Sequence, residues 1–293
     1  MSPAQRLHEL IAHPQLLVMP AAYDAMSARL AQEAGFDALQ VSGLSLSAAD
    51  GLPDFSILSM REMVERTRRI AAAVDIPVMG DGDTGYGGVV NVWHTVREFE
   101  AAGAAGMNLE DQSFPKRCGR VEGKELIPLR EMCAKLDAAA SARRDPYFVL
   151  NARTDALGIE GMDAAIERAN AYLGAGASMV FIQGVSRMSE VEQLAAAIDG
   201  PMGMNLIEQH PGCAELTFER LQAAGVARVS LSASLMLSAI HGMRQGLRRI
   251  REWGGTRVDT QVFAPFNDLH ALCGTEQALA IERRARGFMD AGG

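Results

Sequence analysis

The segment EAGFDALQVSG, residues 33–43, joins the end of an alanine-rich helix to a glycine and then to an apolar run of strand length. Gly35 suits the left-handed position that often follows a helix, so the segment predicts a helix followed directly by a strand. The pattern recurs in AAGAAGMNLED (101–111), GAGASMVFIQG (174–184) and AAGVARVSLSA (223–233). A helix-to-strand junction is therefore repeated along the chain.

Further strand-like runs lie between these repeats and bring the number of expected strands to eight: LLVMP (16–20), IPVMGD (76–81), YFVLNAR (147–153) and PMGMNL (201–206). Amphipathic stretches that predict helices separate them, at 60–74, 91–103, 130–143 and 161–176. Regular alternation of helices with strands that are apolar on both faces favours a (β/α)8 TIM-type barrel with its helices outside. A doubly wound open sheet is the alternative, but no G-x-G-x-x-G follows the first strand.

We expect the barrel to occupy residues 1–250. After the last barrel helix, a polar connection leads to NDLHALCGTEQALAIERRARGF (267–288), which predicts one or two extra helices. Residues 251–293 would thus form a C-terminal helical extension that packs on the barrel or on a neighbouring subunit.

The composition, 48% hydrophobic and 22% charged over 293 residues, is typical of a large globular domain. A net charge of −8 argues against a nucleic-acid or anionic membrane partner, although a local cationic pocket could still bind a small acidic substrate. We predict a cytoplasmic protein, because no apolar run approaches the roughly 20 residues of a membrane span and the N-terminus lacks a signal-peptide core. The four cysteines lie far apart, which indicates neither a zinc site nor a disulfide framework.

Acidic residues follow several predicted strands, at the barrel end where active sites of this fold lie. They are Asp54, Asp81, Asp83 and Glu110. Converging carboxylates repel one another unless a cation lies between them, and oxygen ligands of this kind suit Mg²⁺ or Mn²⁺. The alternative is that each carboxylate is a solvated loop residue.

Other polar groups at this end could bind an anion. Arg153 ends a predicted strand, and its guanidinium matches a carboxylate or a phosphate, unless it pairs with Asp155 or another acid of the rim. Ser42, Gly43 and Leu44 offer backbone N–H groups and a hydroxyl for a second anionic end. These groups predict a substrate with two acidic ends and a metal-chelating oxygen.

Cys118 lies in FPKRCGRVEG (114–123), where Lys116, Arg117 and Arg120 surround it in sequence. Neighbouring cations favour the thiolate, and a thiol that titrates near neutral pH can transfer protons. Residues 113–125 are long enough to form a lid over bound substrate. We predict a catalytic thiol; the alternative is an oxidation-sensitive bystander.

Four ordered motifs together resemble the isocitrate lyase and phosphoenolpyruvate mutase superfamily, over about residues 15–250: SGLSLSAADGLPD (42–54), GDGDTGYG (80–87), NLEDQSFPKRCGR (108–120) and NARTDA (151–156). The Lys-Arg-Cys-Gly run is similar to the lyase branch, which includes methylisocitrate lyase and 2,3-dimethylmalate lyase. The resemblance implies metal-dependent cleavage of a carbon–carbon bond in a 2-hydroxy dicarboxylate or tricarboxylate, with release of a 2-oxo acid.

The resemblance also implies roles for individual residues. Asp81 would contact Mg²⁺ directly, and Asp54, Asp83 and Glu110 would hold its waters. Cys118 would protonate the departing carbanion, with Lys116 and Arg120 as further catalytic residues. The implied substrate-binding residues are Tyr23, Ser42, Gly43, Leu44, Gly119, Arg153, Gln183 and Asn205. A homotetramer, built as a dimer of dimers that exchange their last helix, is implied as well.

The chain departs from the lyase pattern at four positions. Gln40 replaces a tyrosine, Arg120 a histidine and Gln183 a glutamate, and Leu237 lies about where a substrate-binding arginine is expected. These changes favour a smaller or less charged substrate, such as a 2-substituted malate, over methylisocitrate itself, although a methylisocitrate-like acid stays open. An oxaloacetate hydrolase or decarboxylase, an enzyme of phosphorus–carbon bonds and a non-catalytic metabolite-binding barrel are the alternatives.

Overall fold

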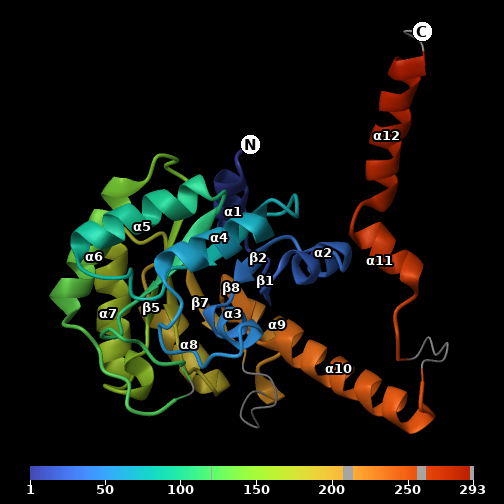
Figure 1. Ribbon diagram of the computed structural model, residues 1–293. Helices are drawn as coiled ribbons and strands as arrows, with labels where there is room; N and C mark the ends of the chain where they lie inside the picture. Colours follow the sequence, from blue (N-terminus) through green and yellow to red (C-terminus); the bar gives the residue numbers. More distant parts are fainter. Residues whose placement is uncertain (120, 207–213, 256–261, 291–293) are drawn as a thin grey trace. The chain divides into compact units, whose positions relative to one another are not determined.

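The protein folds into a closed barrel of eight parallel strands in the order β1 to β8, with β8 paired to β1 (Figure 1). This computed structural model describes residues 1–119, 121–206, 214–255 and 262–290. The strands are β1 (Leu17–Ala22), β2 (Leu39–Val41), β3 (Val78–Asp81), β4 (Gly106–Glu110), β5 (Val149–Thr154), β6 (Met179–Ile182), β7 (Met202–Asn205) and β8 (Arg228–Leu231). The predicted (β/α)8 barrel is confirmed.

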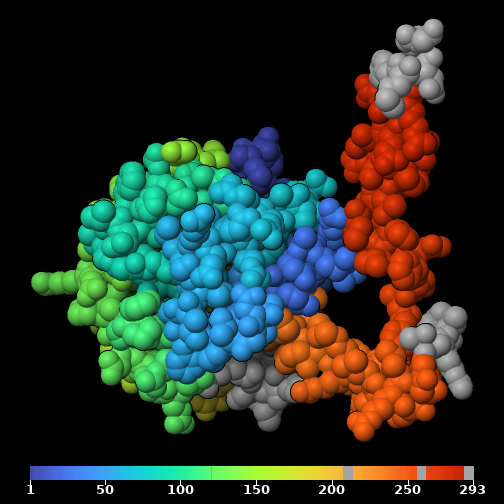
Figure 2. All heavy atoms as spheres, viewed as in Figure 1, coloured from blue at the N-terminus to red at the C-terminus, as the bar shows by residue number. Residues whose placement is uncertain are grey.

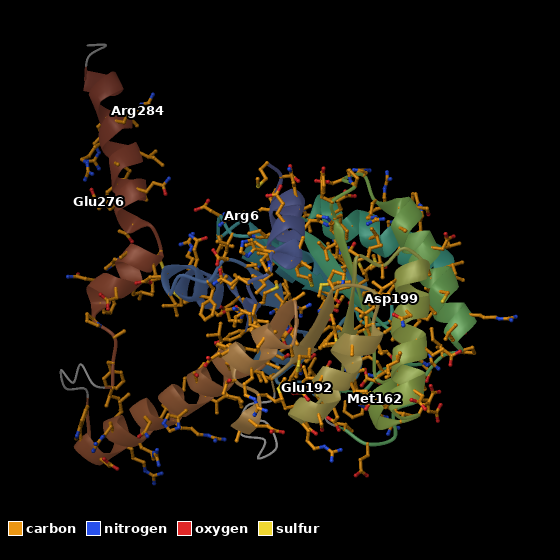
Figure 3. The ribbon with its side chains drawn as sticks, turned by 180° about the vertical axis from the view of Figure 1, so that it is seen from behind. Arg6, Met162, Glu192, Asp199, Glu276 and Arg284 are labelled. Atoms are coloured by element: carbon orange, nitrogen blue, oxygen red, sulfur yellow. The ribbon has the colours of Figure 1, made fainter. Side chains whose placement is uncertain are left out.

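Helices surround the strands, as the ribbon view shows (Figure 1), and the space-filling view shows closely packed atoms on the face drawn (Figure 2). They are α2 (Ala25–Glu33), α3 (Gly43–Ala49), α4 (Met60–Ala71), α5 (Val89–Ala101), α6 (Leu129–Ala142), α7 (Met162–Gly174), α8 (Met188–Ala197) and α9 (Phe218–Ala223), with a short 3₁₀ helix at Ala156–Gly158. On α8 the polar side faces outward: Figure 3 shows Glu192 on α8 and the nearby Asp199, both exposed, whereas Val191 and Leu194 of α8 are buried.

Local sequence explains where these elements begin and end. Ser59 caps α4, because its hydroxyl accepts the Glu62 N–H while the Glu62 carboxylate accepts the Ser59 N–H at 2.7 Å. The glycine of each repeated junction has a positive φ, between 82° and 103°, at Gly35, Gly103, Gly176 and Gly225. Only glycine adopts this conformation without strain, so the repeat predicted by the sequence is a repeat in the structure.

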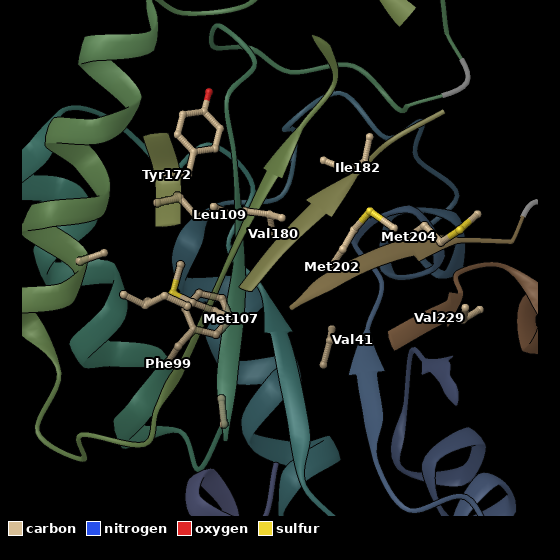
Figure 4. Close-up of a cluster of buried hydrophobic side chains, with 14 of the residues drawn as sticks. Val41, Phe99, Met107, Leu109, Tyr172, Val180, Ile182, Met202, Met204 and Val229 are labelled. Atoms are coloured by element: carbon tan, nitrogen blue, oxygen red, sulfur yellow. The ribbon is translucent and has the colours of Figure 1, made fainter. Parts of the chain in front are cut away.

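Side chains alternate between the two faces of each strand. Figure 4 shows the outer face, where Met107, Leu109, Val180, Ile182, Met202 and Met204 pack in the apolar layer beneath the helices. The residues between them, among them Asn108, Glu110, Phe181 and Asn205, face the barrel interior. The expectation of strands that are apolar on both faces therefore holds for the outer face, while the interior becomes polar toward the carboxyl ends.

The amino end of the barrel is closed by α1 (Pro3–Ala12), which Ser2 caps. Leu7 and Ile11 of this helix form a separate apolar cluster with Leu17, Met19 and Met79. This plug seals one end of the barrel with hydrophobic side chains. A ligand therefore has access to the interior from the opposite, polar end.

The chain divides into two compact units, residues 1–235 and 236–293. The second unit holds most of α10 (Ser234–Trp253), together with α11 (Phe266–Leu272) and α12 (Thr275–Asp290), so the expected extra helices are present. Within it, Trp253 packs edge-on against Phe263, with ring centroids 6.5 Å apart. The predicted boundary at residue 250 lies inside α10, which continues without a break. Helix exchange and the tetramer stay predictions.

No helix within the described ranges combines the length and the hydropathy that a bilayer span requires.

Candidate active site

A cavity opens at the carboxyl ends of the strands, and most of the predicted site residues line it: Ser42, Leu44, Asp54, Asp81, Lys116, Cys118, Gly119, Arg153, Gln183 and Asn205. Asp83 and Glu110 are buried beside it, and the Gly43 N–H donates to Asp81 Oδ2 at 2.8 Å. Tyr23 follows β1 but does not belong to the lining, and Arg120 lies outside the described residues. Sequence motifs far apart in the chain thus meet at one site.

The carboxylates of this site lie in a region with little access to water. Asp54, Asp83 and Glu110 are 8%, 5% and 3% exposed. Burial raises the pKa of Asp83 to about 6, with Lys116 opposing, and the pKa of Glu110 to about 8, with Arg153 opposing. The Asp83 backbone is in the left-handed region, with φ of 46°, which is a strained conformation for a non-glycine residue. Backbone strain and desolvation are both concentrated here.

Lys116 neutralises part of this charge. Its ammonium lies 2.5 Å from Asp54 Oδ1 and 3.2 Å from Asp83 Oδ1, and the side chain is 4% exposed. Burial opposes the charge, but Asp83, Glu110 and Asp54 outweigh it and hold the pKa of Lys116 well above its ordinary value. Lys116 is therefore a charged partner of the acid cluster, although the sequence analysis grouped it with the cations that act on Cys118.

Arg153 forms ion pairs with acids of the rim and also lines the cavity. Its Nη1 lies 3.1 Å from Glu110 Oε2, and its Nε donates to Asp155 Oδ2 at 2.8 Å, while the side chain also lines the cavity. Burial opposes its charge, but Asp155 and Glu110 together hold the pKa of Arg153 well above its ordinary value. The guanidinium is therefore held in place before any ligand binds.

The segment that carries Cys118 closes over the cavity. Its base is a short antiparallel pairing, in which Ser113 N–H donates to Glu125 O at 2.8 Å, and the Cys118 N–H donates to Asp54 O at 3.0 Å. Lys124 joins the segment to the barrel, because its ammonium donates to Gly119 O at 2.9 Å and to Asp155 Oδ1 at 2.6 Å. We call residues 113–125 the lid.

Gly119 shows how closely the lid approaches the site. A Cβ at this position would lie 2.8 Å from both Arg153 Nη2 and Gln183 Cδ, so a larger residue fits only if the lid or these side chains move. Cys118, next to it, faces the same cavity. The lid therefore places Gly119 against Arg153 and Gln183 and contributes Cys118 to the lining of the same cavity.

Asp111 belongs to a supporting layer, even though it follows Glu110 directly. Its Oδ2 accepts hydrogen bonds from Thr154 Oγ1 and Tyr172 Oη, both at 2.7 Å, and its Oδ1 accepts the Asp155 N–H at 3.2 Å. Neighbouring residues in a strand point to opposite faces, which explains why Glu110 faces the site while Asp111 does not. Asp111 thus anchors the end of β5 that carries Arg153.

Several residues of the lining were not among the predicted site residues. Asn108 and Phe181 lie two positions before Glu110 and Gln183, on the same strand faces, and Gln40 has the same relation to Ser42. The alternation of side chains along a strand could have identified them, because the residue two positions before a rim residue lies on the same face, deeper in the barrel. Ser232 and Ala233, after β8, also line the cavity.

The acid cluster has the oxygen donors that a hard cation requires. Asp83 Oδ1 and Glu110 Oε1 are buried and have no well-aligned hydrogen-bond donor within the described part of the chain. Across residues 1–119, 121–206, 214–255 and 262–290, no three His, Cys, Asp or Glu side chains are close enough to ligate one ion together. One direct ligand, with water between the ion and the other carboxylates, is compatible with this spacing.

Comparison with known proteins gives the family. Residues 7–251 match the family model described as phosphoenolpyruvate phosphomutase. The chain is 41% identical over 249 residues to a probable 2-methylisocitrate lyase of Corynebacterium glutamicum, covering 85% of this chain and 80% of that protein. It is 37% identical over 276 residues to 2,3-dimethylmalate lyase of Eubacterium barkeri, covering 93% and 95%.

Solved structures agree with these relatives. Oxaloacetate acetylhydrolase in complex with the inhibitor 3,3-difluorooxalacetate has a TM-score of 0.90 and 32% identity, with 97% of both chains covered. Phosphonopyruvate hydrolase in complex with oxalate and Mg²⁺ has a TM-score of 0.88 and 33% identity, with coverage of 97% and 99%. The chain belongs to the phosphoenolpyruvate mutase family, within the superfamily that also contains the isocitrate lyases. The named lyases among its relatives support the prediction of a carbon–carbon lyase.

The raised carboxyl pKa values predict how stability depends on pH. Folding raises the pKa of Asp83 and Glu110, so their contribution to stability is full below about pH 4 and is lost as pH rises toward 8. In metal-free protein, the free energy of unfolding should fall between pH 5 and 8 in wild type and fall less steeply in the Glu110→Gln variant. The two slopes should differ by up to about 1.4 kcal/mol per pH unit. Urea unfolding in EDTA measures this; equal pH slopes would contradict it.

We predict that the two hydrogen bonds of the Lys124 ammonium, to Gly119 O and Asp155 Oδ1, hold the lid closed. Lys124→Met removes a partly buried ion pair and a hydrogen bond, so we expect trypsin to cleave after Arg117 roughly five to thirty times faster in native protein. Mass spectrometry of the cleavage products measures the rate. Arg130→Met, which removes an exposed charge from α6, is the control and should cleave like wild type. Equal rates in all three proteins would show that Lys124 does not hold the lid.

Proposed function

We propose that this protein is a Mg²⁺-dependent carbon–carbon lyase that acts on a 2-hydroxy dicarboxylate and releases a 2-oxo acid. The observation that carries the proposal is the position of Cys118, which faces the same cavity as a buried cluster of carboxylates. Named lyases of this family support the reaction type.

Asp81 would hold the metal ion directly, while Asp54, Asp83 and Glu110 would hold its water ligands. Three of these carboxylates, Asp54, Asp83 and Glu110, pair with two cations, Lys116 and Arg153. With all four carboxylates ionised, as a bound cation would favour, two negative charges remain for a divalent ion to balance. Carboxylate oxygens favour Mg²⁺, and Mn²⁺ binds similar donors. A bound ion would polarise the substrate oxygen and stabilise the negative charge that develops on it.

The chain's own groups then have separate tasks. Arg153 binds a carboxylate of the substrate, and the Ser42 hydroxyl and the Leu44 N–H bind near the same end. The closed lid excludes water from the cavity. The 2-hydroxyl loses its proton to a carboxylate of the acid cluster and becomes the carbonyl of the 2-oxo acid as the carbon–carbon bond breaks. The electron pair of that bond stays on the departing fragment, and the Cys118 thiol donates a proton to that carbon.

We infer that the substrate is a 2-substituted malate rather than methylisocitrate. Gln183 lines the cavity and cannot carry the charge of the glutamate that lyases have there. Leu237, on α10, cannot replace an arginine that binds a distal carboxylate. Each change removes a charged side chain from the site, so the substrate should carry fewer charged groups than methylisocitrate. A homotetramer and a cytoplasmic location complete the proposal.

Hydrolysis of oxaloacetate is the second candidate. The similarity to oxaloacetate acetylhydrolase over 97% of both chains favours it. This reaction would use the same acid cluster and Arg153, but it would yield oxalate and acetate. Product analysis separates it from the lyase reaction.

Replacement of Cys118 tests the lyase proposal. With Mg²⁺ and a panel of 2-substituted malates, methylisocitrate and oxaloacetate, we expect Cys118→Ala to lower kcat roughly 100-fold or more on the preferred substrate, because the general acid is lost. Substrate binding should be retained. Cys133→Ala, whose thiol on α6 contacts Ala171 O, is the matched control and should turn over like wild type.

Undiminished turnover in Cys118→Ala would reject Cys118 as the acid. Oxalate and acetate as the products of wild type would favour the hydrolase instead. If wild type turned over none of these acids, or the phosphonates of related enzymes, the barrel would be a metabolite-binding protein.

A further inference from the structure

An arginine is buried inside the barrel, one layer below the carboxylates. Arg228, the first residue of β8, is 0% exposed and forms no ion pair with any described residue. Its guanidinium donates to Gln40 Oε1 at 2.6 Å and also to Ser230 Oγ. A buried charge without a counter-ion costs several kcal/mol, so this one requires an explanation.

Partial compensation comes from neutral groups. The Arg228 guanidinium carbon lies 5.5 Å from the centre of the Phe181 ring, and Nη1 lies 3.4 Å from Met79 Sδ. Arg228 Nε has no partner among the described residues. A cation–π contact and neutral acceptors offset only part of a full charge, so a positive potential remains at the floor of the cavity.

Arg228 determines how the Gln40 amide is turned. A guanidinium has donors and no acceptor, so the group that faces it must be the amide oxygen. Ser230 Oγ accepts a hydrogen bond from Arg228 and donates one to Gln40 Oε1 at 2.8 Å. Gln40 Oε1 thus accepts two hydrogen bonds, one from Arg228 and one from Ser230. If the amide were reversed, its NH₂ would face the guanidinium. The Gln40 NH₂ group is therefore the end that remains for a ligand, and Gln40 lines the cavity.

The register of the barrel places this amide deeper than the acid cluster. Gln40 pairs with Met79, and Asp81 lies two residues further along β3. Two residues of a strand correspond to about 6.6 Å, so a ligand that reaches both Asp81 and Gln40 must extend along the barrel axis. The Gln40 NH₂ group donates hydrogen bonds, and the positive charge of Arg228 lies next to it. Together they favour a ligand oxygen as acceptor, above all a carboxylate oxygen.

We propose that Gln40 forms a deep subsite for a carboxylate oxygen of the substrate, and that Arg228 is the positioning residue that keeps its NH₂ group turned toward the cavity. The inference rests on the proposed function, since it assigns one more contact to the same substrate. It predicts that the preferred substrate is a dicarboxylate long enough to reach from the metal layer to the floor.

Binding of two probes by Mg²⁺-loaded protein tests this, with calorimetry as the measurement. Oxalate is too short to span the two layers, whereas malate is longer. We expect Gln40→Leu to raise the Kd of malate five- to tenfold and that of oxalate less than twofold. Gln40→Glu should weaken malate binding further, because a carboxylate replaces a donor. Gln32→Leu is the matched control: the Gln32 amide oxygen accepts the Asp75 N–H, and the side chain does not line the cavity.

A double-mutant cycle tests the role of Arg228. If Arg228 acts through Gln40, Arg228→Met and Gln40→Leu together should weaken malate binding by clearly less than the product of the two single effects. Should Arg228→Met not fold, Ser230→Ala, which removes the second donor to the same oxygen, replaces it in the cycle. Thermal unfolding of each variant establishes that it is folded.

The outcomes separate the two proposals. If wild type binds neither probe with Mg²⁺, the proposed function is wrong, and the subsite with it. If wild type binds both probes but Gln40→Leu leaves the Kd of malate unchanged, the subsite is rejected and the proposed function stands. Independent effects in the double-mutant cycle would reject Arg228 as the positioning residue.

Discussion

The burial of several carboxylates at one end of the barrel is the constraint on which the site depends. Asp54, Asp83 and Glu110 are almost inaccessible to water, and a buried charge is tolerated only when opposite charges lie nearby. Two cations meet this requirement from different parts of the chain. Arg153 comes from the rigid strand β5, and Lys116 comes from the lid. The remaining negative charge makes this end of the barrel suitable for a divalent ion.

Because Lys116 belongs to the lid, charge neutralisation and lid closure are physically coupled. The same short segment places the Lys116 ammonium against Asp54 and Asp83 and attaches the Cys118 backbone to Asp54. Lys124 fastens the other end of the segment to Asp155, which in turn holds Arg153. The acid cluster and the thiol are therefore linked through one short segment of the chain.

Much of this arrangement follows from sequence alone, and the limits have physical causes. Four junctions with a glycine after the helix predicted the barrel, because a left-handed residue between helix and strand is a local requirement that recurs in each repeat. The polar residues at strand ends predicted the rim of the site. The direction of Lys116 could not be predicted, since it depends on long-range contacts with Asp54 and Asp83. Arg228 was missed for a related reason: composition leads one to expect apolar side chains in a barrel core, and its Gln40 partner is distant in sequence.

The most direct test of the central claim is a crystal structure of the protein with Mn²⁺, in which anomalous scattering locates the ion without reference to any assumed ligand. We expect one strong peak at the carboxyl end of the barrel, within about 2.3 Å of a carboxylate oxygen of Asp81, with waters between the ion and Asp54, Asp83 and Glu110. A crystal with millimolar Mn²⁺ and no peak at this position, or with a peak elsewhere on the molecule, would contradict it.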